Sequence, residues 1–236
     1  MQLSRTTLLL VWGMTPAVAG SFVNLNFESS LPSSPVPGDP WERHPISRVM
    51  IGWSGYNGDQ PETAVSINNI FLDSAGISLF TTRVSGPLDF SSEILQGTQS
   101  AFLQAGVQPG FGPIVPTSLA QTGTVPVGVQ SLQFEAILGN APFTVSLNGV
   151  ASPVWELALN DRGAAPASKT FGVDVSPYAG KEVDLRFTVL PGDTQHGTLV
   201  LDRLQFSASS VPEPATWTLL GTGAIALGLR LRKRGS

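Results

Sequence analysis

The chain has 236 residues, 42% of them hydrophobic and 13% charged, with 25 glycines and 19 prolines. The length and hydrophobic content favour one large domain, and the many glycines and prolines favour strands and turns over long helices. Cysteine is absent, which excludes disulfides, thiolate zinc sites and cysteine nucleophiles. Apart from the two ends, the body carries 8 basic against 16 acidic residues, which argues against nucleic acid as a partner because phosphate backbones are also negative.

The N-terminal residues predict a cleavable secretory signal. Arg5 precedes an apolar run over residues 8–14, and Ala17-Val18-Ala19 has the small-x-small pattern of a signal-peptidase cleavage site. A buried helix is the alternative, but Gly13 and Pro16 would interrupt it. Residues 1–19 are therefore predicted to direct Sec-type export and to be removed by signal peptidase after Ala19.

Residues 20–208 are predicted to form one antiparallel β-sandwich. Apolar and polar residues alternate over residues 132–136, 143–147 and 183–189, as expected for strands with one buried and one solvent-exposed face. Asn148-Gly149 predicts a hairpin turn because both residues tolerate positive φ. The Pro-rich residues 31–40 indicate a long surface connection, of a kind common in Greek-key sandwiches.

The C-terminal residues 209–236 have three parts in order. Pro212, Glu213 and Pro214 lead into an uncharged apolar stretch over residues 217–229. A basic cluster closes the chain, formed by Arg230, Arg232, Lys233 and Arg234. The apolar stretch is about 20 Å long as a helix, against roughly 30 Å of bilayer, so the flanks must contribute to a span. We predict a short transmembrane helix whose basic end stays in the cytoplasm.

This tail resembles the PEP-CTERM sorting signal. The resemblance implies processing by exosortase, a membrane protease-transpeptidase of Gram-negative bacteria that make extracellular polysaccharide. The expected route is export, transient retention in the inner membrane with the body on the periplasmic side, and transfer to the cell surface or extracellular matrix. An ordinary membrane anchor that happens to follow Pro-Glu-Pro is the alternative.

Several body segments resemble galactose-binding-like jelly rolls. The longest is residues 173–187, and shorter ones occur at residues 26–28, 52–53, 100–103 and 201–206. The resemblance implies that the first and last strands lie near each other and that an acid from each helps to hold a structural calcium ion. Glu28 and Asp202 occupy those positions, although Arg203 stands where a second acid is often seen. Calcium takes six to eight oxygens, so plain surface or salt-bridged acids are the alternative, and no other cofactor is expected.

The body shows no reactive constellation. The two histidines, His44 and His196, lie in Pro- and Gly-rich segments, and neither a nucleophile elbow nor an HExxH motif is present. Carboxylates are numerous enough to supply a glycosidase pair, but their spacing identifies no particular two. We expect no catalytic residues and no enzyme, with a polysaccharide-active enzyme as the alternative.

Residues 53–59 form the best candidate for ligand binding. Trp53, Tyr56, Asn57 and Asp59 combine aromatic rings with polar groups on a Gly-rich loop. Three further aromatic residues could add to such a platform: Trp41, Trp155 and Tyr178. Core packing is the competing interpretation of these aromatics.

These observations lead to one expectation with two alternatives. The expected protein is an exported cell-envelope or matrix protein whose non-enzymatic sandwich is a binding or structural module, with extracellular polysaccharide as the candidate ligand. A polysaccharide-active enzyme and a purely structural matrix protein are the alternatives.

Overall fold

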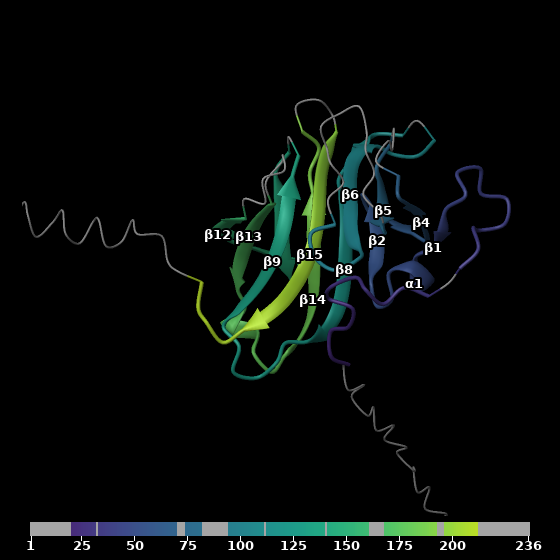
Figure 1. Cartoon of the computed structure of the whole chain (residues 1–236). Coiled ribbons are helices and arrows are strands. Elements are labelled where there is room, and N and C mark those ends of the chain that lie inside the picture. The colour runs from purple at the N-terminus through teal and green to yellow at the C-terminus, as the bar shows by residue number, and fades with distance from the viewer. Residues whose placement is uncertain are drawn as a thin grey trace, which may run out of the picture.

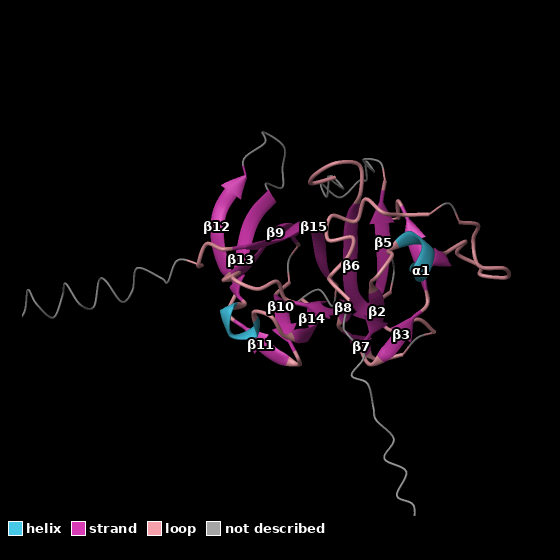
Figure 2. Cartoon of the chain, turned by 90° about the horizontal axis from the view of Figure 1, so that it is seen from below, coloured by secondary structure: helices cyan, strands magenta, loops and turns pink. Residues whose placement is uncertain are grey.

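The computed structural model describes residues 20–31, 33–69, 74–81, 94–110, 112–139, 141–160, 168–192 and 196–211. These residues form two β-sheets packed face to face (Figures 1 and 2). Helix in the described residues is limited to the single turn α1 (Ile46–Val49) and the 3-10 turn η1 (Ser176–Tyr178). The predicted all-β sandwich is confirmed.

Within the described residues the larger sheet has nine strands, and neighbouring strands are antiparallel except for the parallel pair β4 and β5. Its order is β1 (His44–Pro45), β4 (Ala64–Ile67), β5 (Gly76–Phe80), β6 (Ser100–Val107), β15 (Gly197–Ser207), β9 (Ser131–Leu138), β13 (Ser168–Asp174) and β12 (Trp155–Asn160). The short strand β7 (Ile114–Val115) pairs with β6 beside this path. In Figure 1 the last strand, β15, lies in the middle of the sheet between β9 and β6.

The smaller sheet has six antiparallel strands in the part of the chain that the structure describes. Its order is β11 (Val150–Ser152), β10 (Phe143–Leu147), β14 (Glu182–Val189), β8 (Thr117–Thr124), β2 (Ser54–Asn57) and β3 (Gln60–Glu62). Asn148 and Gly149 join β10 to β11 with φ of 52° and 76°, so the predicted hairpin is confirmed. Both angles lie in the left-handed region that Asn and Gly tolerate.

The core lies between the two sheets and follows from the alternation along the strands. In β14 the side chains of Val183, Leu185, Phe187 and Val189 are at most 1% exposed, whereas the residues between them face solvent in whole or part. Phe134 of β9 joins the two sheets, because its ring centroid lies 5.1 Å from that of Phe187 on β14 of the smaller sheet. Within its own sheet it stacks on Phe171 of β13 at 5.6 Å. Burial of such rings is the main stabilising contribution.

A second, smaller cluster covers part of the outer face of the nine-stranded sheet. It consists of Phe80, Leu95, Phe102, Ile137 and Val200, all buried. Leu95 precedes β6 and is 1% exposed, so it fixes the described residues before that strand against the sheet. This packing sets the position of residues 96–100, which form part of the candidate site.

The first described residues contact strand β8 and then the last strand, β15. Leu204 of β15 donates its backbone N–H to the carbonyl of Leu25 at 3.0 Å, and Ser21 forms an isolated parallel bridge with Thr124. The start and end of the body are therefore neighbours in space, as the jelly-roll resemblance implied.

The predicted signal (residues 1–19) and most of the sorting tail, including Pro212, Glu213, Pro214 and the basic cluster at residues 230–234, lie outside the described residues. The described ranges contain no helix that is long and apolar enough to cross a membrane. The predicted transmembrane helix falls in the part that the structure does not describe and stays a prediction.

Candidate functional site

Glu28 holds the turn that precedes β6. Its Oε1 accepts backbone N–H groups of Thr98 at 2.7 Å and Gln99 at 3.0 Å, and its Oε2 accepts the Thr98 hydroxyl at 2.5 Å. Gly97 makes this approach feasible, because a Cβ at that position would collide with the Glu28 carboxylate. The Glu28 side chain, near the start of the body, therefore hydrogen-bonds to a turn about 70 residues later in the chain.

Asp202 of β15 holds the same segment from the other side. Its Oδ2 accepts the Gln96 N–H and the Ser100 hydroxyl, each at 2.9 Å. Its Oδ1 accepts the N–H of Arg203 at 2.6 Å. We call Glu28, Asp202 and residues 96–100 the carboxylate clasp, because two acids from distant parts of the chain grip one segment.

Unusual backbone geometry accompanies both acids. Phe27, immediately before Glu28, has φ of 57°, and Arg203, immediately after Asp202, has φ of 54°. The pairing of β15 with β9 also shifts register between Asp202 and Gln205. Left-handed conformations are unfavourable for such side chains and tend to occur where surrounding structure imposes them, often at functional sites.

The electrostatics of the two acids differ. Asp202 is fully buried, and this burial, with a further contribution from the charge of Glu28, raises its pKa to about 6 despite its hydrogen bonds. Partial burial also acts to raise the pKa of Glu28, but the hydrogen bonds from Thr98 and Gln99 outweigh it and lower that pKa. Neither acid forms an ion pair with a described residue, and the nearby Arg203 guanidinium lies 3.9 Å from Glu135.

The clasp suits a cation in charge but supplies few oxygens. The two carboxylates repel each other, and no described cation lies between them, so binding of a positive ion would be electrostatically favourable. Gln99, which donates to Glu28, also has the buried side-chain oxygen Oε1 for which the described structure offers no hydrogen-bond donor. Calcium would need further oxygens from backbone carbonyls or water. Among the described residues no three His, Cys, Asp or Glu side chains gather as a metal-ligand group.

The structure does not bring together the four residues predicted to bind a ligand. Trp53 is 3% exposed, packs 5.3 Å from Phe27 between ring centroids, and donates Nε1 to the carbonyl of Asn24 at 3.1 Å. Asn57 is 2% exposed and also lies inside the sandwich. Alternation in β2 places Tyr56 on the opposite, outer face, and Asp59 is exposed in the turn between β2 and β3.

Tyr56 belongs to a polar patch on the outer face of the six-stranded sheet. The guanidinium carbon of Arg186, on β14, lies 4.4 Å from the centre of the Tyr56 ring, a cation–π arrangement. The hydroxyls of Ser118 and Thr188, on the adjacent strands β8 and β14, are 3.0 Å apart. Ser118 is 4% exposed, so the half-buried Tyr56 ring, Arg186 guanidinium and Thr188 hydroxyl are the groups that can contact a polar ligand such as a sugar.

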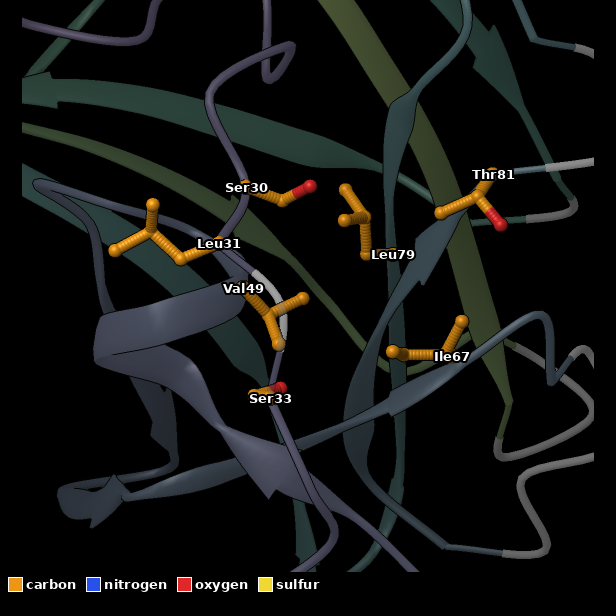
Figure 3. A pocket seen from close by; sticks show the side chains of 7 residues that line it. All are labelled: Ser30, Leu31, Ser33, Val49, Ile67, Leu79 and Thr81. Carbon is orange, nitrogen blue, oxygen red and sulfur yellow. The ribbon is translucent and has the colours of Figure 1, made fainter.

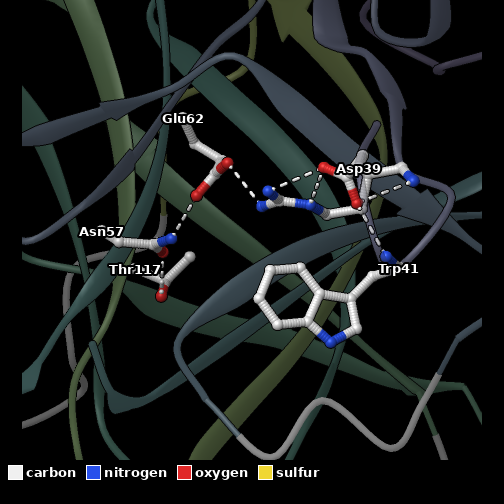
Figure 4. A network of polar contacts seen from close by, with 6 residues as sticks. Asp39, Trp41, Asn57, Glu62 and Thr117 are labelled. Atoms are coloured by element: carbon white, nitrogen blue, oxygen red, sulfur yellow. Dashed lines mark hydrogen bonds and ion pairs between the residues drawn. The ribbon is translucent and has the colours of Figure 1, made fainter. Parts of the chain in front are cut away.

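A second polar network runs from the interior to the loop before β1, as Figure 4 shows. Thr117 donates its hydroxyl to Asn57 Oδ1 at 3.0 Å, and Asn57 Nδ2 donates to Glu62 Oε2 at 2.6 Å. Glu62 Oε1 then accepts Arg43 Nη1 at 2.9 Å, and Arg43 donates Nε to Asp39 Oδ2 at 3.0 Å. Burial raises the pKa of Glu62, although the Arg43 charge opposes this.

No local pattern in the chain predicts this network. Asp39, Arg43 and Glu62 lie in segments whose pairing depends on the fold, and acids are too common in the body for spacing to single out two of them. The Pro-rich connection that contains Asp39 was recognised, but its contacts were not.

A pocket of about 360 Å³ lies beside α1 and the strands β4 and β5 (Figure 3). The described residues that line it are Ser30, Leu31, Ser33, Val49, Ile67, Leu79 and Thr81. They offer three hydroxyls among aliphatic side chains, without a charged or aromatic group. Such a lining gives little basis for specific recognition of a polar ligand.

Residues 210–233 match the model of the PEP-CTERM protein-sorting motif. This confirms the resemblance of the tail to the PEP-CTERM motif, and the matched range contains Pro212, Glu213 and Pro214 and the basic residues as far as Lys233. No curated protein matches the chain.

Several solved structures resemble the chain at low sequence identity. TmCBM61 in complex with β-1,4-galactotriose has 10% identity and a TM-score of 0.37, over 79% of this chain and 97% of that one. The family 11 carbohydrate-binding module from Clostridium thermocellum has 12% identity and a TM-score of 0.35, over 69% and 92%. The enzymatically active domain of bacteriophage CBA120 tailspike protein 4 has 13% identity and a TM-score of 0.35, over 67% of this chain but 19% of that one. With TM-scores below 0.5, these likenesses carry no weight for ligand or activity.

Proposed function

We propose that this chain is an exported cell-envelope or matrix protein whose C-terminal tail is processed by exosortase. The match of residues 210–233 to the PEP-CTERM motif carries the proposal. The secretory pattern of residues 1–19 supports it, because a sorting tail acts only on a protein that has entered the export pathway. The tail helix holds the protein in the inner membrane with the sandwich on the periplasmic side until exosortase cuts or transfers it to the surface or matrix.

The test is the intact mass and membrane fractionation of the protein from its native host, with and without exosortase. A species that begins near Gly20, ends near the Pro-Glu-Pro segment and leaves the membrane only with exosortase supports the proposal. A variant with Pro212, Glu213 and Pro214 replaced by alanine should then remain in the membrane. Retention of Arg230 to Ser236 under both conditions would make the tail a plain anchor.

The sandwich acts in this scheme as a non-enzymatic binding or structural module, with a polysaccharide as the candidate ligand. The half-buried Tyr56 ring, Arg186 guanidinium and Thr188 hydroxyl on the outer face of the six-stranded sheet support this role. Glycan-array binding of the full chain, compared with Tyr56→Ala, tests it. Absence of binding would leave the structural role, and glycan turnover lost on replacement of one acid would establish the enzyme alternative.

The carboxylate clasp is proposed to hold a structural calcium ion. Glu28 and Asp202 would bind it directly, and the Oε1 atom of Gln99 is the additional side-chain candidate. Calcium would supply the positive charge that balances the two acids and would fix residues 96–100 to β15. Calcium binding by wild type and Asp202→Asn, followed by isothermal titration calorimetry, tests this proposal, because equal affinity would exclude Asp202 as a ligand.

A further inference from the structure

Trp41 is an exposed aromatic side chain on a rigidly held loop. It is 63% exposed, and the other large hydrophobic residues exposed in the described part of the chain are aliphatic. Single exposed apolar residues are common and need no explanation by themselves. What distinguishes Trp41 is the set of contacts that fix its surroundings.

Three interactions fix the loop around Trp41 (Figure 4). Asp39 Oδ1 accepts the backbone N–H of Trp41 at 2.9 Å. Asp39 Oδ2 pairs with Arg43 through Nε at 3.0 Å and Nη2 at 2.9 Å. The guanidinium carbon of Arg43 lies 5.2 Å from the centre of the indole ring, so one face of the ring rests on a cation.

The support extends from this loop into the interior. Arg43 also donates Nη1 to Glu62 at 2.9 Å, and Glu62 is held by Asn57, which is 2% exposed. A chain of polar contacts therefore leads from the interior of the sandwich to an exposed ring. Ordering a surface side chain in advance of binding reduces the entropy lost on binding.

We propose that Trp41 is a stacking platform for one ring of a neutral polysaccharide, with Arg43 as the adjacent hydrogen-bond donor. This inference rests on the proposed carbohydrate-binding role and assigns it a site. A guanidinium covers at most one face of the indole, which leaves the other face for the C–H side of a sugar ring. Arg43 has five N–H groups, of which the contacts above use three, so two remain for sugar hydroxyls.

The charges around the ring favour a neutral sugar over an acidic one. Asp39, Glu42 and Glu62 outnumber Arg43 in this part of the structure, and the body as a whole has 16 acids against 8 bases. Polysaccharides rich in uronic acids would meet this negative field. A protein partner fits less well, because one ring among polar residues is smaller than the apolar centre of a specific protein interface.

The test measures binding of the full chain to neutral hexasaccharides of β-linked glucose, galactose, mannose and xylose, and to a hexamer of a uronic acid. Isothermal titration calorimetry gives the affinity, and protection of tryptophan fluorescence from acrylamide reports contact with an exposed indole. The variants are Trp41→Ala, Trp41→Phe, which keeps a ring, and Val127→Ala. Val127 is the matched control because it is an 87% exposed apolar residue elsewhere on the sandwich. Thermal unfolding checks that each variant is folded.

We expect a neutral hexamer to bind, Trp41→Ala to weaken it by about tenfold or more, and Trp41→Phe to retain most of the affinity. Val127→Ala should bind as wild type does. Undiminished binding by Trp41→Ala would overturn the assignment of Trp41 but leave the carbohydrate-binding role intact. Equal losses in Trp41→Ala and Val127→Ala, or tighter binding of the uronic acid hexamer, would also overturn it. No binding of any hexamer by wild type would overturn the carbohydrate-binding role itself, and the platform with it.

Discussion

Replacing Asp202 with Asn should remove a large part of the pH dependence of stability in calcium-free protein. Asp202 is fully buried, and burial raises its pKa from 3.8 to about 6. The folded state then binds this proton more tightly than the unfolded chain does. Its contribution to stability is full below pH 3.8 and is lost as the pH rises through 6. The shift corresponds to about 3 kcal/mol.

The assay is urea unfolding at several pH values between 4 and 7 in the presence of EDTA. The informative quantity is the unfolding free energy of wild type minus that of Asp202→Asn, because other titrating groups contribute equally to both proteins. This difference should fall by about 2 to 3 kcal/mol between pH 4 and pH 7. Asp59→Asn, which makes the same change of charge at an exposed turn, is the control.

A difference that stays constant across this pH range would refute the reasoning. It would mean that the pKa of Asp202 is the same in the folded and unfolded states. The hydrogen bonds to its carboxylate would then offset the cost of its burial in full. A difference that rises with pH would mean that the ionised form is the one stabilised by folding, as an undetected cation in the clasp would cause.

Three further predictions concern the clasp and the core. Calcium added to EDTA-treated protein at pH 7 should raise the unfolding free energy of wild type, by about 2.7 kcal/mol at a calcium concentration 100 times the dissociation constant. The unfolding free energy of Asp202→Asn should not change, and an equal gain for both proteins in a urea titration would count against the proposed ion. Gly97→Ala should destabilise by about 2 to 4 kcal/mol, because the new Cβ meets the Glu28 carboxylate. Gly128→Ala has a similar φ of 80° but open space around it, so it should lose only about 1 to 2 kcal/mol, and equal losses would disprove the collision. Trp53→Ala should cost about 3 to 5 kcal/mol in thermal or urea unfolding, whereas a folded variant of unchanged stability that loses glycan binding would favour the ligand role instead.

Local patterns were sufficient to predict the strands and the hairpin. The alternation in residues 183–189 identifies strand β14, because a strand between a core and solvent needs apolar residues at every second position. Asn148-Gly149 specifies its turn because few other pairs accept positive φ twice. The PEP-CTERM motif was equally recognisable, since it is read as a linear segment.

The face that each residue of β2 presents was not predictable in the same way. Trp53, Tyr56, Asn57 and Asp59 form one candidate binding group in the sequence because they are close together there, but only Tyr56 and Asn57 lie in β2. The period of two places Tyr56 and Asn57 on opposite faces, but which of them is buried depends on the sheet that packs against β2. Asn57 is accepted inside because Glu62 and Thr117 satisfy its amide.

The sequence by itself determined the class of the fold and revealed the PEP-CTERM motif, because strand periodicity is local and the motif is a linear segment. The tertiary structure decided which acids work together. Glu28 reaches Thr98 across 70 residues, and Asp202 reaches Ser100 across 102. It also decided that Arg43, held by Asp39 and Glu62, would lie under Trp41. Such contacts depend on how strands pair and sheets pack, and no short-range pattern in the chain encodes them.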